Sequence, residues 1–366
     1  MPETTVRYFN GTMAGAPSLA NTAGSLISLL DACLVDGFGA VTLDSLAVAA
    51  NVATATVSAG HNLAMVGETG PVVRISGATP SGLNGDWRVT ITSTTTFTFA
   101  TTGISDQTAT GTITAKRAPA GFSKAFSGTN KAAYRSDEVA GTRLYVRIDD
   151  SATTSARIRG YEAMTDVDTG TGLFPTDAQI SGGLYVYKAS AANRVWALVS
   201  DGRIVYFFCD ASGNGQYVGG FVFGDLASYV PGDAYGVVII ASGSASGAHS
   251  LHLVSSTSNS YLARRFDSIG GSLPSARYTH AKSAYLGSGG DLYPAPTDLA
   301  LHLWPVEVWD NTETSRGLLP GCWNPVHLYS SSVGINYGIH EVNGRTLVPQ
   351  VTNNYRGVLD VTGPWR

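Results

Sequence analysis

Residues 60 to 99 alternate between apolar and polar side chains, and this alternation constrains the fold more than any other feature of the chain. Val73 and Ile75 are separated by an arginine, and Phe97 and Phe99 are separated by a threonine. A period of two is typical of strands with one buried face, because successive side chains point to opposite sides of a sheet. Turn-forming residues interrupt the pattern between these runs. The segment therefore predicts a small β module built from hairpins.

The longer part of the chain after this module also has the pattern of antiparallel β structure. Short apolar runs recur with Gly- and Ser-rich turns between them, and Asp201-Gly202 separates two of these runs in a way that predicts a tight hairpin. Strands at regular spacing without alternating helices indicate a sandwich or barrel. The predicted class is mainly β, with an antiparallel sandwich or barrel as the main domain.

One amphipathic helix is predicted near the amino terminus, within Ser18–Val35. Asn21 or Thr22 is expected to cap its start and Gly37 to end it. Its apolar stripe consists of Leu26, Leu29, Leu30, Cys33 and Leu34. The predicted organisation is an amino-terminal segment (1–42) packing on the main domain, an inserted small β module (43–117), and a main β-rich domain (118–366) of one or two sub-domains.

The chain of 366 residues carries few charges. Charged residues make up 14% of it, against roughly 25% in typical soluble domains. Sparse charge suits a subunit whose surface is covered by neighbours in an assembly, and a secreted β-rich protein is the alternative explanation. A net charge of -4 argues against a nucleic-acid surface. The basic clusters Arg157-Ile158-Arg159 and Arg264-Arg265 are too small to change this.

Cysteine usage and the absence of targeting patterns indicate folding in a reducing cytoplasm. Cys33, Cys209 and Cys322 are odd in number and widely spaced, so three buried or half-buried thiols are expected in place of a disulfide framework. The amino terminus does not have the pattern of a signal peptide. Apolar stretches are of strand length, so membrane insertion is not expected.

No residue pattern predicts a catalytic, metal or cofactor site. His249 and His252 are close in sequence, but in a strand this spacing places them on opposite faces, which is a poor geometry for binding one metal ion. Asp149-Asp150 and the pair Asp166 and Asp168 could begin a calcium loop, yet no later bidentate glutamate follows, and turn-capping aspartates are the preferred explanation. A carboxylate pair for glycoside hydrolysis cannot be assigned from sequence. The chain is therefore predicted not to be an enzyme.

Four segments resemble an uncharacterised family of tailed-phage and prophage virion proteins. These segments are AYRSDEVAGTRLYVRIDD (133–150), RGYEAMTDVDTGTGLFPT (159–176), RGLLPGCWNPVH (316–327) and DVTGPWR (360–366). The module at 60–115 is similar to the Ig-like or carbohydrate-binding-like modules of many phage structural proteins. The resemblance implies a structural part of the particle in the tail, baseplate or adhesion apparatus, with the head surface as second choice. It names no reaction.

Tryptophans are the candidate contact residues. The run 316–327 holds two prolines and two glycines, which predicts an irregular ordered loop around Trp323, and Trp365 lies in a similar Pro/Gly context. Pro305 predicts an edge or a bulge in the strand-like run 299–309. Large aromatic side chains stack on sugars and form interface hot spots. The interface candidates are Trp323, Trp365, Trp309 and Trp304.

Three functions are compatible with these features. The first is a virion subunit that contacts copies of itself around a symmetry axis and other virion proteins, with its localisation in the particle. The second is a receptor- or glycan-binding module on the virion. The third is an enzyme that attacks host polysaccharide, and it ranks last.

Overall fold

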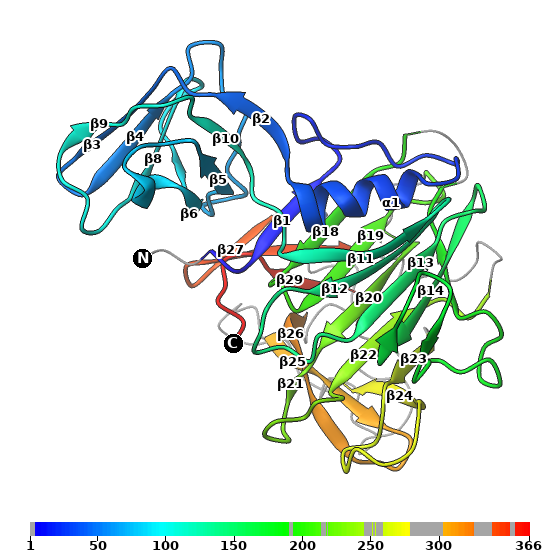
Figure 1. Ribbon diagram of the computed structural model, residues 1–366. Coiled ribbons are helices and arrows are strands. Elements are labelled where there is room, and N and C mark those ends of the chain that lie inside the picture. Colours follow the sequence, from blue (N-terminus) through cyan, green and yellow to red (C-terminus); the bar gives the residue numbers. More distant parts are fainter. Residues whose placement is uncertain are drawn as a thin grey trace, which may run out of the picture.

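The computed structural model describes residues 4–189, 193–213, 217, 219–244, 251, 253, 259–278, 303–325, 339–351 and 356–366. The chain is mainly β with one short helical segment, and its sheets are antiparallel, which confirms the predicted fold class. A small module stands to one side of a larger body (Figure 1).

The body is built around a 13-stranded sheet in the order β1-β18-β19-β20-β22-β23-β24-β25-β26-β29-β28-β27, with β21 paired to β26. Its strands are β1 (Arg7–Asn10), β18 (Trp196–Ser200), β19 (Ile204–Cys209), β20 (Gly219–Asp225), β21 (Ala227–Ser228), β22 (Val237–Ala241), β23 (Asn259–Leu262), β24 (Leu273–Tyr278), β25 (Leu303–Asp310), β26 (Ser315–Pro325), β27 (His340–Val342), β28 (Arg345–Val351) and β29 (Arg356–Asp360).

The central strands of this sheet are buried on both faces. In β19 the side chains of Tyr206 and Phe208 enter one core, and those of Val205 and Phe207 enter the other. All six residues of β19 are buried, as are all residues of β18, β20 and β22. A strand covered on both faces needs no polar alternation, which explains the continuous apolar run IVYFFC. The first core includes side chains from the central strands, β25, β26, β28 and β29.

The second core lies between the central strands and a separate five-stranded sheet. Its order is β11-β12-β13-β14-β17, and its inward residues include Tyr134, Ile148 and Ile158. The other face of this sheet carries mostly polar and aromatic side chains. The strands are β11 (Phe122–Gly128), β12 (Lys131–Ser136), β13 (Tyr145–Asp149), β14 (Ser155–Tyr161) and β17 (Leu184–Tyr187), and the hairpin of β15 (Ala163–Met164) and β16 (Gly170–Thr171) follows β14.

The predicted helix forms, but its start differs from the prediction. Helix α1 (Ser25–Leu30) continues into a π-helical turn, η1 (Asp31–Asp36), and Gly37 ends it as predicted. All five residues of the apolar stripe are buried in the second core. The capping prediction was wrong: Gly24 holds the N-cap position at φ 81°, without a side-chain cap. The cap comes from far along the chain, because the carboxylate of Asp150 accepts the N–H of Leu26 at 2.8 Å.

The module is a two-sheet β-sandwich. One sheet has the order β2-β10-β5-β6 and the other β7-β8-β4-β3-β9. The core between them contains Val73 and Ile75 from one sheet and Phe97 and Phe99 from the other, as the alternation predicted. The strands are β2 (Phe38–Thr42), β3 (Ser45–Ala49), β4 (Val52–Thr56), β5 (Val72–Ser76), β6 (Gly85–Arg88), β7 (Thr90–Ile91), β8 (Thr96–Ala100), β9 (Gln107–Thr108) and β10 (Thr114–Arg117). A 3-10 helical turn, η2 (Ser81–Leu83), lies between β5 and β6.

The first sheet of the module begins before the predicted boundary at residue 43. Strand β2 pairs with β10, so the sandwich starts at Phe38. Between β2 and β3 the chain crosses from one sheet to the other at Leu43 and Asp44, whose N–H groups bond to Ile113 and Thr56 respectively. The strand-like run 41–48 continues through this crossing, so the sequence does not reveal it.

A tight turn at Val66–Thr69 attaches the module to the body. The N–H of Glu68 donates to Oε1 of Glu341 at 2.9 Å, and the Thr69 hydroxyl lies 2.6 Å from that of Thr346 and 3.0 Å from that of Thr362. The side chain of Val66 belongs to the first body core. The module is therefore held in one orientation by apolar and polar contacts together.

A second contact joins β6 of the module to β1 of the body. Asp86 accepts a hydrogen bond from Arg7 at 2.7 Å and another from Arg74 at 2.7 Å. Nearby, Arg88 donates to the carbonyl of Val6 at 3.0 Å. Burial of Asp86 works to raise its pKa, but the hydrogen bonds and charges of Arg74 and Arg7 outweigh it and lower the pKa below 3.8.

Substitution Asp86→Asn is expected to reduce stability by about 1 kcal/mol at pH 6, because charge-assisted hydrogen bonds are lost. The folded pKa of Asp86 is depressed, so its contribution is present above pH 4 and is lost as the pH falls through the folded pKa. Urea unfolding of both proteins between pH 6 and pH 3 should show the difference shrinking toward acid. A difference that stays constant over this range contradicts the assignment.

Candidate functional site

The predicted contact tryptophans lie on neighbouring strands of the large sheet, except Trp365. Trp304 and Trp309 belong to β25 and Trp323 belongs to β26, and all three are half-buried. In the register of these strands Trp304 faces Asn324, and Pro305 faces Trp323. Because directly opposed residues share a face and successive residues alternate, Trp304 and Trp323 point to opposite faces of the sheet.

The predicted irregular loop around Trp323 was wrong, because residues 315 to 325 form one continuous strand, β26. The register shifts between the pairs Pro305–Trp323 and Glu307–Leu318, so four residues of β26 bulge opposite one residue of β25. Gly321 lies in this bulge at φ 66°. Pro320 and Gly321 lie within this bulge, and the expectation of an edge or bulge at Pro305 is confirmed.

Trp365 packs against this bulge. Its ring meets the ring of Tyr206 edge-on at 5.7 Å, and its Nε1 donates to the carbonyl of Asp360 at 2.8 Å. A Cβ on Gly321 would lie 2.1 Å from the Trp365 ring, so the ring needs a glycine there. Tyr206 is fully buried, and its hydroxyl donates to the carbonyl of Pro320 at 2.8 Å. Trp365 therefore closes the first body core.

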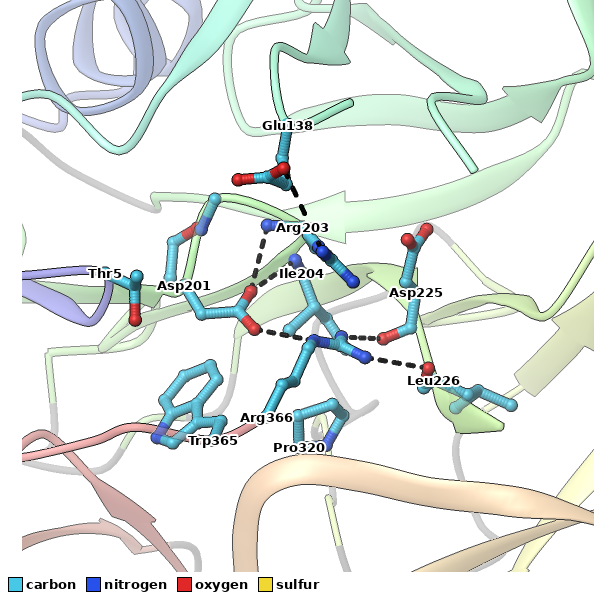
Figure 2. A network of polar contacts seen from close by, with 12 residues as sticks. Thr5, Glu138, Asp201, Arg203, Ile204, Asp225, Leu226, Pro320, Trp365 and Arg366 are labelled. Atoms are coloured by element: carbon cyan, nitrogen blue, oxygen red, sulfur yellow. Dashed lines mark hydrogen bonds and ion pairs between the residues drawn. The ribbon is translucent and has the colours of Figure 1, made fainter. Parts of the chain in front are cut away.

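Arg366 ties the end of the sequence to the predicted hairpin (Figure 2). Its Nε donates to the Asp201 carboxylate at 2.9 Å, and its guanidinium also donates to the carbonyls of Asp225 and Leu226. The other Asp201 oxygen accepts the N–H groups of Arg203 and Ile204, which closes the turn between β18 and β19. The predicted hairpin at Asp201-Gly202 is confirmed. These contacts hold Arg366 against the turn between β18 and β19 and against the residues that follow β20.

An open depression of about 460 Å³ lies on the outer face of the five-stranded sheet. The strands that carry the depression, β13 and β14, are on the side of the body away from the module (Figure 1). Arg147 lies directly opposite Arg159, and Asp149 directly opposite Arg157. The residues that line the depression are Arg147, Asp149, Arg157, Arg159, Tyr161, Asp168 and Gly182.

Backbone carbonyls hold the arginines of the depression in place. Arg147 donates to the carbonyl of Val167 at 2.7 Å, and Arg157 to that of Gly182 at 3.1 Å. The Arg157 guanidinium also lies 3.7 Å from the centre of the Tyr185 ring, which is a close cation–π contact. Arginines fixed in this way lose little side-chain entropy when they bind a ligand.

The acidic side chains of this region remain ionised. Hydrogen bonds from Lys131 and Arg147 lower the pKa of Asp168, and a hydrogen bond from Arg159 lowers the pKa of Asp177. Three arginines and two aspartates line the depression, so its walls carry a net positive charge and also carboxylate acceptors.

The sequence revealed only part of this site. The alternation of 143–150 and the cluster Arg157-Ile158-Arg159 were visible, but the meeting of Arg147 with Arg159 follows from the pairing of β13 with β14. The signal that could have found it is the matching alternation on both sides of the turn between these strands. A hairpin places residues of equal phase on one face.

The candidate calcium aspartates are used within the protein. Asp166 accepts the N–H of Asp168 at 2.8 Å, which caps its own turn as preferred from sequence. Asp149 lies on the outer face of the sheet, whereas Asp150 points inward and is fully buried. The pair Asp149-Asp150 therefore cannot bind one ion together.

His61 and the three cysteines lie within the packed structure. Nε2 of His61 lies 2.7 Å from the carbonyl of Ser93, and its Nδ1 accepts the N–H of Leu63. His249 and His252 lie outside the described residues. Cys33, Cys209 and Cys322 are buried thiols, as predicted. Over the described ranges, no group of three or more His, Cys, Asp or Glu residues is placed to hold a metal ion.

The sequence of this chain matches no protein-family model, and no curated protein matches it. Within the described residues, no helix has the length and apolar character needed to cross a membrane.

Proposed function

We propose that this chain is a non-enzymatic structural subunit of a tailed bacteriophage particle, in the tail, baseplate or adhesion apparatus. The observation that carries the proposal is the attachment of the module to the body through Val66, a member of the body core, and through the contacts of Glu68 and Thr69. A module held in one orientation relative to the body presents its surface at a defined place in an assembly. The resemblance of four sequence segments to tailed-phage virion proteins supports the same function.

The composition supports an assembled state. Only 14% of the residues are charged, and weakly charged surfaces lose little hydration when copies associate. The chain is proposed to contact copies of itself around a symmetry axis and other virion proteins. A position on the head surface is the second choice of location.

The test is detection of the chain in purified particles. Mass spectrometry of gradient-banded phage should find it in stoichiometric amounts, and a gold-labelled antibody should mark the tail end. A host cytoplasmic enzyme measured in the same fractions serves as the contamination control. The purified chain should also be oligomeric in size-exclusion chromatography with light scattering. Absence of the chain from the particles contradicts the proposal.

A second function, glycan binding on the virion, is favoured by one specific observation. The depression on β13 and β14 combines fixed arginines, ionised aspartates and a tyrosine, which are the side chains that bind charged sugars.

A further inference from the structure

We propose that the depression on the outer face of β13 and β14 binds a hexuronic acid, which is a sugar that carries a carboxylate. This inference rests on the glycan-binding form of the proposed function and names its ligand class and its site. The site is separate from the four tryptophans predicted as interface residues. Three of these lie on the large sheet, and Trp365 packs against Tyr206.

Arg159 is the residue that points most directly to a ligand. Its side chain is only 10% exposed, and one terminal nitrogen donates to Asp177 while lying 3.4 Å from the carbonyl of Ile180. Its Nε meets no hydrogen-bond partner among the described residues. A buried donor without an acceptor costs free energy, and because Arg159 lines the depression, an anion bound there would interact with its guanidinium.

The neighbouring charges favour a carboxylate at this position. Arg147 lies directly across from Arg159 on the next strand, and two like charges side by side repel each other unless an anion lies between or beside them. Asp168 and Asp149 compensate part of this repulsion through Arg147, and Asp177 does so through Arg159. Asp168 and Asp177 are 53% and 66% exposed, so solvent weakens their effect, and a bound carboxylate would add to the compensation.

The aspartates of the depression argue for a sugar over a simple inorganic anion. Asp149 and Asp168 line the depression beside the arginines. Carboxylates repel phosphate or sulfate, but they accept hydrogen bonds from hydroxyl groups. A ligand with one carboxylate and several hydroxyls can bind the arginines through its carboxylate and the aspartates through its hydroxyls. The volume of about 460 Å³ lies within the usual range of small-molecule sites, about 300 to 1,000 Å³.

Binding is tested on the purified chain with D-glucuronate, and D-glucose and sodium sulfate serve as ligand controls. Ligand-observed NMR titration should show glucuronate binding, with no binding of glucose and at least about tenfold weaker binding of sulfate. Arg159→Gln should weaken glucuronate binding about tenfold or more. Arg157→Gln tests the same site at a half-buried residue on the same strand, and it should weaken binding several-fold.

Arg265→Gln is the matched control, because Arg265 is 48% exposed and pairs with Asp267 in another part of the body. It should bind glucuronate like the unmodified chain. A tetrasaccharide of alternating glucuronate and N-acetylglucosamine distinguishes a polysaccharide ligand from a free sugar acid. Tighter binding of the tetrasaccharide than of the monosaccharide assigns the site to a polysaccharide, and equal binding assigns it to the free sugar acid.

The proposal is overturned if glucuronate does not bind, if sulfate binds as tightly, or if both Arg157→Gln and Arg159→Gln bind unchanged. The assay does not depend on particles. A chain that binds glucuronate but is absent from virions contradicts only the structural function, and a virion subunit that does not bind glucuronate contradicts only this inference.

Discussion

Replacing Lys188 by methionine is expected to lower the free energy of unfolding by about 3 to 5 kcal/mol. The Lys188 ammonium donates to the carboxylate of Asp150 and to the carbonyl of Thr22, and both charged side chains are fully buried. The same carboxylate accepts the N–H of Leu26 at the start of α1. Removing the ammonium would leave a buried charge that only the helix amides compensate.

This loss should depend on pH in a defined direction. Burial already raises the pKa of Asp150, and Lys188 counteracts the rise. Without Lys188 the pKa of Asp150 in the folded state should rise further above its unfolded value, so stability increases as the carboxyl group takes up a proton. Urea unfolding of Lys188→Met at pH 7 and pH 5 should therefore show a smaller deficit at pH 5.

Two further variants complete this experiment. Lys188→Met combined with Asp150→Asn should recover much of the stability, because the amide oxygen still accepts from Leu26 and no buried charge remains. Lys131→Met removes an ion pair whose partner, Asp168, is 53% exposed, and it should cost less than about 1 kcal/mol. A loss for Lys188→Met as small as that control would refute the role of the buried pair.

Substitution Trp365→Ala is expected to reduce stability by about 3 kcal/mol, since the ring covers Tyr206 and the bulge at Gly321. Trp365→Phe should cost about 1 kcal/mol, because the ring stays and the hydrogen bond to the carbonyl of Asp360 is lost. Chemical unfolding of the purified variants measures both effects.

The same variants distinguish packing from assembly. If Trp365 serves chiefly as an interface residue, Trp365→Ala will change the oligomeric state while the free energy of unfolding stays within about 0.5 kcal/mol of the original value. Arg366→Ala is a neighbouring variant that removes the bond to Asp201 and those to two carbonyls. It should cost about 1 kcal/mol, because Asp201 keeps its contacts with Arg203 and Ile204.

Local pattern was enough to determine the fold class, the module core, the hairpin at Asp201-Gly202 and the apolar stripe of α1. Each of these depends on residues within a few positions of one another, where the periods of strand and helix leave a direct trace in the sequence. The strand β26 was missed for the opposite reason. Its Pro320 and Gly321 are typical of a loop, and only the pairing with β25 and β29 makes them a bulge within a sheet.

The tertiary structure alone decided which distant residues meet. Asp150 accepts the N–H of Leu26, which lies 124 positions earlier in the sequence, and Arg366 donates to Asp201, which lies 165 positions before it. The arginines of the depression gather because β13 and β14 pair in one register out of several that the alternation would allow. Hydrogen bonds and charge contacts between remote segments follow from strand order and register, and the two-residue period of the sequence does not specify either of them.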